Sequence, residues 1–331
     1  MSQTKVYQIM PESLSLMECY VIRTSSDRVI VIDGGIDGHG KQAPVYLPSA
    51  IRAVLGLGQD DYFEVEAWFL SHAHTDHIYE LAKMLEAYTP ASNYRINHLY
   101  FNFPPFGNGF DVRSAPTDPS YAEMDALRRG MDNYARVNGL DGFSYDAVNG
   151  AVITPEAIRR GLTITVDDCS FDVLQTWDPS DFCVNSTSTV LRMRCGAHSI
   201  LFLGDAYVDS GDRLLRTRGA DALRSEYVQL AHHGQHGCSK EFYLAIGTDE
   251  SVRLWPSPVW VWGVYKHGAI VCDETRSWFG LPEKPDDYFA AGCDKTGRDL
   301  VSGLYAAYPA DPAKVSDWTD EVLAAQLAAV F

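Results

Sequence analysis

The hydrophobic residues of this chain follow two periods, two residues in some segments and three to four in others. Short alternating or apolar runs bounded by Pro, Gly, Ser and Asp are typical of β-strands, and apolar positions three and four residues apart are typical of helices. The pattern predicts strands at 6–9, 15–23, 28–32, 63–70, 96–101, 162–166, 170–177, 189–195, 199–203 and 227–231. It predicts helices at 48–57, 78–88 and 121–137, and an amphipathic helix at about 317–330.

The order of these elements indicates the fold class. The first three strands follow one another through tight turns, which is typical of antiparallel pairing. Helices and strands then alternate, as in parallel βαβ units, before a second run of strands begins at residue 162. We expect an α/β sandwich in a single domain spanning 1–331. An insertion is expected at about 102–150, and the helix at 317–330 is expected to dock on the body.

The insertion begins with an aromatic loop at 102–120 that is rich in Pro and Gly. Its aromatic residues either pack back on the body or form a wall of a substrate cleft.

Composition and charge narrow the functional classes. Hydrophobic residues make up 46% of the 331 residues and charged residues 21%, which is ordinary for a globular protein. We find no apolar run long enough for a membrane helix and no apolar leader, and we therefore expect a cytoplasmic protein without membrane contact. The net charge of −17 disfavours long nucleic acids as partners and favours a small-molecule substrate.

The seven cysteines are scattered and form no Cys-x-x-Cys pair, so we expect reduced thiols. Cys238 lies close to a histidine cluster, but packing explains it more simply than function.

The turn after the strand at 63–70 carries a metal-ligand pattern. His72, His74, Asp76 and His77 lie within six residues, between a buried strand and an amphipathic helix. Imidazole and carboxylate groups are the ligands that suit Zn²⁺ and its neighbours. In the alternative interpretation, a residue such as Ser71 caps the helix and the histidines face water. Three histidines and one aspartate on one short turn favour the metal site.

Two later segments supply further candidates. Asp205 follows an apolar strand and a glycine, a position that turn residues also occupy. His232, His233 and His236 fall within five residues after the strand at 227–231. Unpaired buried imidazoles are costly, so these histidines are not expected to be core residues.

These segments together resemble the metallo-β-lactamase fold superfamily of metallohydrolases. The resemblance rests on the His-x-His-x-Asp-His turn at 72–77, on Asp205 and on Ala-His-His-Gly at 231–234, and it extends over about 5–305. The last motif is similar to the branch that includes the hydrolase domain of competence (ComEC-type) proteins. The resemblance implies a four-layer αββα sandwich with a metal site at one edge of the β-sandwich.

The resemblance also implies a ligand set for two divalent ions, with Zn²⁺ favoured and Mn²⁺ or Fe as alternatives. The first ion would take His72, His74 and Asp205, and the second Asp76, His77, Asp205 and His232. Asp33, which closes the strand at 28–32, is expected to support the ligands from behind. The catalytic residues are expected to be Asp76 and His233, with His233 beside the leaving group. Sequence alone leaves open which of the two adjacent histidines is the ligand.

The chain departs from the family pattern at one position. Most members place a further histidine in the stretch that corresponds here to 184–189, which contains Asn185 and Ser186. Amide and hydroxyl oxygens are weaker Zn²⁺ ligands than imidazole, so the first ion would bind loosely or be Mn²⁺. His236 and His267 are further candidates at the cleft rim, although a surface or structural role explains each more simply.

The activity that the resemblance implies is hydrolysis by a metal-bound hydroxide, with a small phosphoester or phosphodiester as substrate. Two other classes stay open: an iron-dependent redox member of the same fold, and a non-catalytic metal-binding or scaffold protein. The diiron type usually carries Glu where this chain has His74, which favours hydrolysis. The natural substrate and the oligomeric state are left open.

Overall fold

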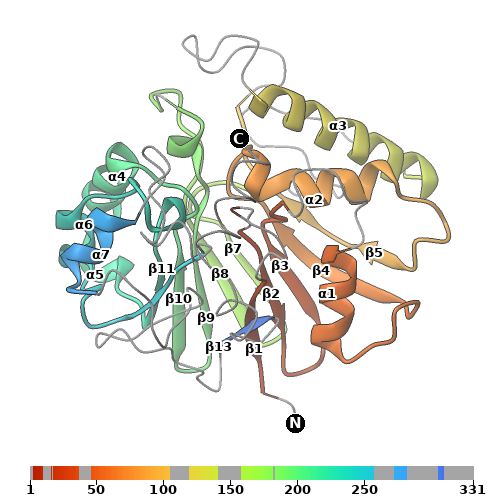
Figure 1. Cartoon of the computed structure of the whole chain (residues 1–331), viewed down its shortest axis with the longest axis horizontal. Helices are drawn as coiled ribbons and strands as arrows, with labels where there is room; N and C mark the ends of the chain where they lie inside the picture. The colour runs from red at the N-terminus through yellow and green to blue at the C-terminus, as the bar shows by residue number, and fades with distance from the viewer. Residues whose placement is uncertain are drawn as a thin grey trace, which may run out of the picture.

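Two β-sheets pack face to face, and helices cover both outer faces (Figure 1). The computed structural model describes residues 3–9, 16, 18–36, 46–104, 119–140, 158–181, 183–256, 272–281 and 305–308. Within these residues the architecture is the four-layer αββα sandwich that the sequence predicts.

The first sheet comes mainly from the N-terminal half of the chain. Its first three strands are antiparallel, as predicted, and the following strands join in parallel through helices. The strand expected at 96–101 is two short strands, because each pairs with a different part of one long neighbour. The members are β1 (Lys5–Ile9), β2 (Tyr20–Arg23), β3 (Val29–Ile32), β4 (Phe63–Phe69), β5 (Tyr94–Ile96), β6 (Leu99–Tyr100) and β13 (Tyr305–Tyr308), in the order β13-β1-β2-β3-β4-β5 with β6 also on β4.

The second sheet comes from the later half of the chain. Its first four strands form an antiparallel meander, and the last two join in parallel. The members, in the order β12-β11-β10-β9-β8-β7, are β7 (Thr163–Val166), β8 (Cys169–Gln175), β9 (Val190–Cys195), β10 (His198–Phe202), β11 (Tyr227–Gln229) and β12 (Val252–Leu254).

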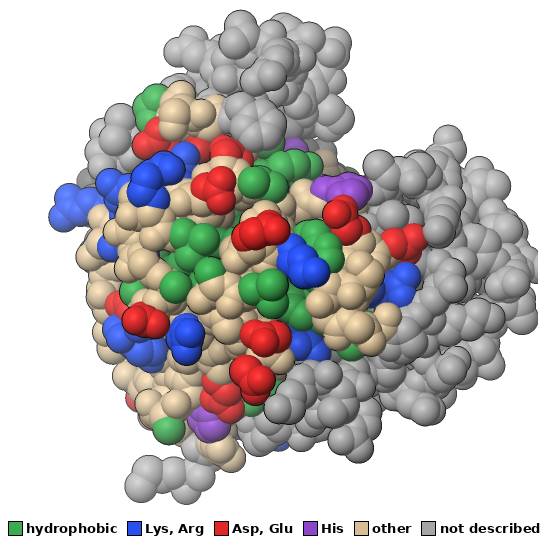
Figure 2. Space-filling view, turned by 90° about the vertical axis from the view of Figure 1, so that its left-hand side faces the viewer, with side chains coloured by type: hydrophobic (Ala, Val, Ile, Leu, Met, Phe, Trp, Pro, Cys, Tyr) green, Lys and Arg blue, Asp and Glu red, His purple; other side chains and the backbone are tan. Residues whose placement is uncertain are grey.

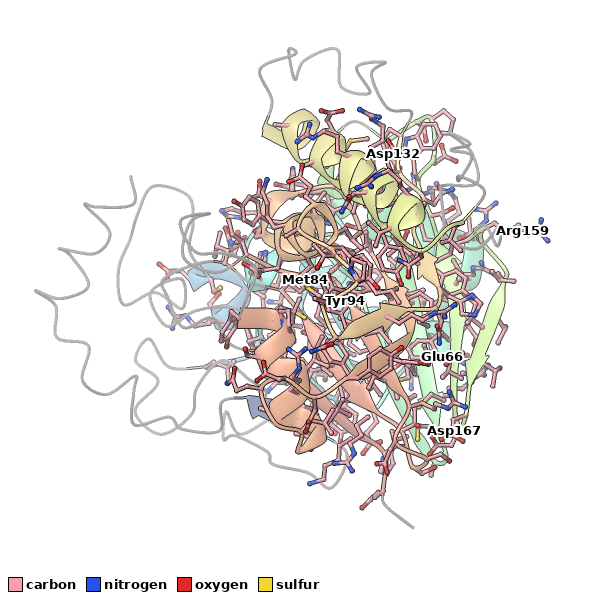
Figure 3. The ribbon with its side chains drawn as sticks, turned by 90° about the vertical axis from the view of Figure 1, so that its right-hand side faces the viewer. Glu66, Met84, Tyr94, Asp132, Arg159 and Asp167 are labelled. Carbon is pink, nitrogen blue, oxygen red and sulfur yellow. The ribbon has the colours of Figure 1, made fainter. Side chains whose placement is uncertain are left out.

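Helices pack on the outer face of each sheet. The first sheet is covered by α1 (Tyr46–Leu55), α2 (Thr75–Glu86) and α3 (Pro119–Val137), and the second by α4 (Val208–Arg218), α5 (Ala220–Leu223), α6 (Lys240–Ala245) and α7 (Asp273–Trp278) (Figure 1). The expected insertion at 102–150 thus contains α3, which lies across α2 (Figure 3). The Asn133 amide group fixes this crossing, since it donates to the carbonyls of Leu85, Glu86 and Tyr88 at the end of α2. Most of the aromatic loop at 102–120 and the helix expected at 317–330 lie outside the described residues.

Three apolar cores separate the four layers. In β3, Val29 and Val31 face the helices, whereas Ile30 and Ile32 face the opposite sheet. Because both faces of the strand are covered, its sequence is a continuous apolar run instead of an alternating one. Burial of each such side chain contributes about 1.5–3 kcal/mol to folding.

On the face formed by α4–α7, the described residues form no extended basic stripe. Acidic and basic side chains are interspersed there among small apolar patches, as far as the described residues show (Figure 2). None of the described helices combines the length and the apolar composition that a membrane span requires. Cys238 is buried against the carbonyl of Ala206, which agrees with a packing role.

Candidate metal centre

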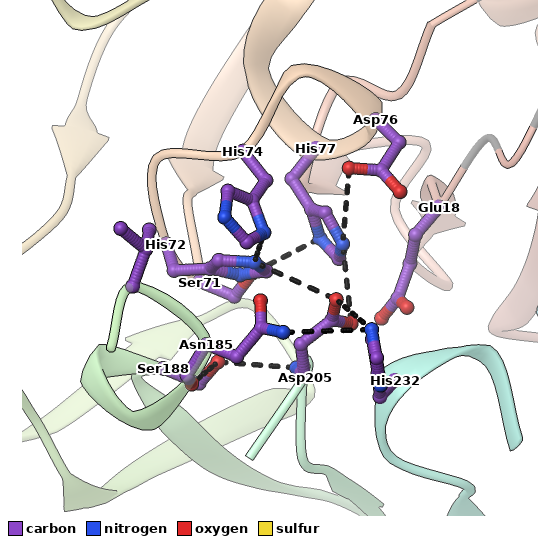
Figure 4. Close-up of polar contacts among 12 residues, drawn as sticks. Glu18, Ser71, His72, His74, Asp76, His77, Asn185, Ser188, Asp205 and His232 are labelled. Atoms are coloured by element: carbon purple, nitrogen blue, oxygen red, sulfur yellow. Dashed lines mark hydrogen bonds and ion pairs between the residues drawn. The ribbon is translucent and has the colours of Figure 1, made fainter. Parts of the chain in front are cut away.

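The candidate ligands gather at one edge of the sandwich, beyond the ends of β3, β4, β10 and β11 (Figure 4). The carboxyl ends of parallel strands meet at the same sheet edge, and loops that leave them converge there. Both sheets therefore supply side chains to the same place.

The His-x-His-x-Asp-His turn is held from behind by Asp33. The Asp33 carboxylate accepts hydrogen bonds from the Ser71 backbone N–H at 2.7 Å and from the Ser71 hydroxyl at 2.8 Å. Its Oδ2 also lies 2.9 Å from Nδ1 of His77. This contact turns Nε2 of His77 toward the other ligands. The expected supporting position of Asp33 is thus observed, and the Ser71 side chain bonds Asp33 instead of capping α2.

One group of potential ligand atoms comes from His72, His74 and Asp205. His72 Nε2 lies 3.1 Å from His74 Nδ1 and 3.6 Å from Asp205 Oδ2. One ligand atom of each residue lies within 4.8 Å of the others, which is close enough for a shared cation.

A second group lies on the other side of Asp205. Asp205 Oδ1 is 3.2 Å from Nε2 of His77 and 3.8 Å from Nε2 of His233. Asp76 Oδ2 is 3.1 Å from the same His233 nitrogen. Glu18, His77, Asp205 and His233 also offer ligand atoms within 4.8 Å of one another.

Asp205 occupies the centre of the arrangement, with one carboxylate oxygen toward each group. Its backbone N–H donates to the hydroxyl of Ser188 at 3.1 Å. The preceding Gly204 has φ +54°, and a Cβ there would lie 2.9 Å from Cβ of Ser71. Only glycine therefore permits β10 to end so close to the histidine turn.

The electrostatics of the centre reflect this close packing. Burial acts to raise the pKa of the Asp205 carboxyl, but the imidazoles of His77 and His233 outweigh it and hold the pKa below its usual range. Burial lowers the pKa of His72, and the neighbouring His77 adds to this effect. For His77 the carboxylates of Asp205 and Asp33 outweigh burial and raise the pKa. Burial raises the pKa of Glu18 to about 8.

These residues fit a pair of cations. Nε2 of His77 and Oδ1 of Asp205 are buried and lie 3.2 Å from each other, and neither makes a well-aligned hydrogen bond among the described residues. Buried polar atoms without a partner are rare and costly. A divalent ion between them would coordinate both, and imidazole and carboxylate are its usual ligands.

The two adjacent histidines lie differently from expectation. His233 donates from Nδ1 to the carbonyl of Pro256 at 2.7 Å, which leaves Nε2 facing Asp76 and Asp205. His232 Nε2 instead lies 3.4 Å from the Asn185 amide nitrogen and 3.9 Å from Oδ2 of Asp205. The sequence left open which of the two is the ligand; in the structure His233 lies in the second group, and His232 lies at the rim.

The backbone explains this difference. His232 and His233 both have φ +55°, and Gly234 follows at +76°. Left-handed conformations of residues other than glycine cost about 1–3 kcal/mol each and cluster at functional sites. A Cβ on Gly234 would lie 2.4 Å from the Trp255 ring, so the tight turn depends on this glycine.

Each of the four remaining sequence candidates has a different position. Asn185 lies at the rim beside His232, as described above. The hydroxyl of Ser186 donates to Asp209 at 2.9 Å. His236 is 53% exposed and pairs with Glu274 at 3.5 Å, which places it away from the two ligand groups. His267 lies outside the described residues.

Sequence reasoning missed Glu18, which comes from the segment just before β2. Its signal was a single acidic residue inside an apolar stretch, and this is too weak to stand out by itself. Ser71 and Ser188 were missed as supports of the ligands, because serine at a turn is common for reasons of local structure.

Comparisons with known proteins agree with this geometry. Residues 18–152 match the family model described as the metallo-beta-lactamase superfamily, whose members are mostly metal-dependent hydrolases. This match supports the resemblance drawn from the motifs, and the two-sheet architecture is the metallo-β-lactamase fold. No curated protein matches the chain.

Several solved structures are similar to this chain at low sequence identity. The metallo-beta-lactamase fold protein YhfI from Bacillus subtilis is 15% identical, with a TM-score of 0.34 over 68% of this chain and 70% of that one. BJP-1, a subclass B3 metallo-beta-lactamase of Bradyrhizobium japonicum, is 17% identical, with a TM-score of 0.33 over 69% and 77%. CmlA, a diiron beta-hydroxylase from Streptomyces venezuelae, is 12% identical, with a TM-score of 0.36 over 74% of this chain, and the match spans only 37% of its length.

Proposed function

We propose that this chain is a metal-dependent hydrolase of small phosphoesters, and of phosphodiesters in particular. The observation that carries the proposal is the position of Asp205, whose two carboxylate oxygens face two separate groups of imidazoles. A carboxylate in this position offsets the mutual repulsion of two cations and keeps them close together.

The proposal assigns each ligand group to one ion. His72, His74 and Oδ2 of Asp205 would hold the first ion. Asp76, His77, His233 and Oδ1 of Asp205 would hold the second, so the roles expected for His232 and His233 are exchanged. When bound, such a pair of ions activates a water molecule and polarises the phosphoryl oxygen under attack.

The protein's own groups then orient the reaction. Asp33 fixes the ring of His77, and the Pro256 carbonyl fixes the ring of His233, so that each presents Nε2 to the centre. At the rim, His232 and Asn185 offer a ring nitrogen and an amide N–H 3.4 Å apart. We assign this pair to binding the phosphoryl or leaving-group oxygens, because the Asn185 amide donates hydrogen bonds and the His232 ring donates or accepts one according to its tautomer.

Charge supports an anionic substrate of limited size. Two bound divalent ions would be local positive charges that attract the anionic oxygens of a phosphoryl group. The rest of the chain carries an excess of acidic residues, which repels a long polyanion. A nucleotide-sized phosphodiester meets both conditions.

The proposal is tested by assaying the metal-loaded protein against chromogenic phosphodiesters, phosphomonoesters, carboxylic esters and lactones. We expect turnover of a phosphodiester that is lost after chelation and restored by Zn²⁺ or Mn²⁺. Asp205→Asn should lower kcat by more than about 100-fold, which exceeds the usual effect of residues that only support a ligand. His198→Ala is the matched control, since His198 is a half-exposed histidine paired with Glu226.

Three outcomes would contradict the proposal. If the metal-loaded protein hydrolyses no phosphoester, phosphoesters are not its substrate class. Bound iron with turnover that consumes oxygen would instead support the redox alternative. Full metal loading with no turnover of any substrate would leave the non-catalytic alternative.

A further inference from the structure

Glu18 is a buried carboxylate at the centre that the family motifs do not include. It precedes β2 in the first sheet and is 1% exposed. Its backbone N–H donates to the carbonyl of Asp76 at 3.0 Å, which fixes this segment against the first turn of α2. Figure 4 shows its side chain directed toward the region of Asp205.

Among the described residues, hydrogen bonds supply little compensation for a negative charge on the buried Glu18 side chain. Gln229 Nε2 lies 3.4 Å from Glu18 Oε2, at the long end of the range for a hydrogen bond. The same amide group also donates to the carbonyls of Leu230 at 2.8 Å and Gly204 at 3.1 Å, so it is shared. A buried carboxylate normally requires a close cation or several strong donors.

A purely supporting role beside His233 does not account for this placement. Glu18 Oε2 lies 4.0 Å from Nδ1 of His233, but that nitrogen already donates to the Pro256 carbonyl at 2.7 Å. Asp33, by contrast, contacts the supporting nitrogen of His77 directly at 2.9 Å. Asp33 orients the ring of His77, whereas Glu18 faces the centre and orients no histidine ring in this way.

We propose that Glu18 is an additional ligand of the second metal ion, and that it makes this site prefer Mn²⁺ or Fe²⁺ over Zn²⁺. The inference rests on the proposed function for the existence of the second ion. Its geometric basis is that Glu18, His77, Asp205 and His233 present ligand atoms within 4.8 Å of one another. With Asp76, the second site then contains three carboxylates and two imidazoles.

The metal preference follows from this ligand set. Zn²⁺ favours four ligands with nitrogen or sulfur prominent among them. Carboxylate oxygens suit harder cations such as Mn²⁺, and additional ligands suit ions with higher coordination numbers. A fifth ligand that is an oxygen therefore shifts selectivity toward Mn²⁺ or Fe²⁺.

The test compares metal binding by the apo forms of the wild type, Glu18→Gln and Glu80→Gln. Glu80 is a second buried glutamate, on α2 and outside both ligand groups, so it controls for removing a buried acid. We expect the wild type to bind two Mn²⁺ ions. In Glu18→Gln the second Mn²⁺ should bind at least about 10-fold more weakly, with a smaller change for Zn²⁺.

Electron paramagnetic resonance gives a readout that does not depend on activity. With Mn²⁺ added at one equivalent beyond the two that the sites require, the wild type should show the signal of two coupled Mn²⁺ ions. Under the same conditions Glu18→Gln should show mainly isolated Mn²⁺. Glu80→Gln should retain the coupled signal. A crystal structure of the Mn²⁺-loaded wild type, which needs no variant, should place a Glu18 oxygen within about 2.5 Å of the second ion.

The outcomes separate the two proposals. If the wild type binds two ions and Glu18→Gln binds both with unchanged affinity and selectivity, the role of Glu18 is wrong and the proposed function stands. If the wild type binds no second ion under any loading condition, the proposed function itself fails. A Mn²⁺-loaded structure with Glu18 turned away from the metal would also overturn the inference.

Discussion

At the scale of single residues, the role of each histidine depends on which of its two ring nitrogens already makes a hydrogen bond within the protein. His77 and His233 each use Nδ1 for a fixed protein acceptor, Asp33 in one case and the Pro256 carbonyl in the other. Each therefore presents Nε2 to the centre. His232 instead has its Nε2 3.4 Å from the amide nitrogen of Asn185, at the rim where a substrate would be contacted.

This difference predicts opposite phenotypes for the two adjacent histidines. His233→Ala should lose most of the second metal equivalent, because it removes a direct ligand. His232→Ala should retain both ions and lower kcat by about 10²–10⁴-fold, the range for a group that assists proton transfer or binding in the transition state. Metal content by mass spectrometry and steady-state kinetics of both variants provide the measurement.

The reverse result would restore the order expected from sequence. If His232→Ala loses the metal and His233→Ala keeps it, the histidine assignment made here is wrong.

The sequence predicted which segments carry the clustered histidines and carboxylates, but it did not predict how the side chains of adjacent residues are arranged. The turn at 72–77 and Asp205 lie where the motifs placed them. His232 and His233 could not be distinguished, because two consecutive residues in left-handed conformation direct their side chains differently. Glu18 was not predicted, since its proximity to Asp205 arises from the pairing of distant segments and not from local spacing.

At the scale of elements, the fold brings loops together by ending several strands at one edge. The strands of the first sheet were predictable because Val29–Ile32 and Phe63–Phe69 are strongly apolar. The helices of the second half were not. Only Ser210, Gly211, Arg213 and Leu214 are buried in α4, and α6 and α7 have six residues each, so their apolar patterns are short. β12 has three residues, which is below the length that periodicity detects.

The core between the two sheets fixes the position of one sheet, and of its loops at the metal centre, relative to the other sheet and its loops. Phe69 is fully buried there, with ring centroids 4.9 Å from Phe171 on the opposite sheet and 5.2 Å from Tyr100. Phe69→Ala should lower the free energy of unfolding by about 3–5 kcal/mol, because it leaves a cavity between the sheets. Urea denaturation measures this change.

Leu244→Ala is the control for that substitution. Leu244 is 47% exposed on α6, and its truncation should change the free energy of unfolding by less than about 1 kcal/mol. A loss of under about 1 kcal/mol for Phe69→Ala would show that the two sheets do not pack as described.

At the scale of the whole molecule, the centre joins the two halves of the sandwich. His72, His74, Asp76 and His77 come from the first sheet and its helix, whereas Asp205 and His233 follow strands of the second. Ions held between them would therefore bridge the sheets and stabilise the folded state, since ligands that bind only the native form add to its stability. The overall charge of −17 has a separate effect, because it disfavours the approach of long polyanions.

The central claim is that two cations lie on either side of the Asp205 carboxylate. The most direct measurement is anomalous X-ray diffraction from crystals of the Mn²⁺-loaded protein, recorded at a wavelength where manganese scatters strongly. We predict two peaks about 3.5–4 Å apart, one beside His72 and His74 and the other beside His77 and His233. The absence of any peak between these side chains at full metal loading would contradict the account, as would a single peak with Asp205 at its periphery.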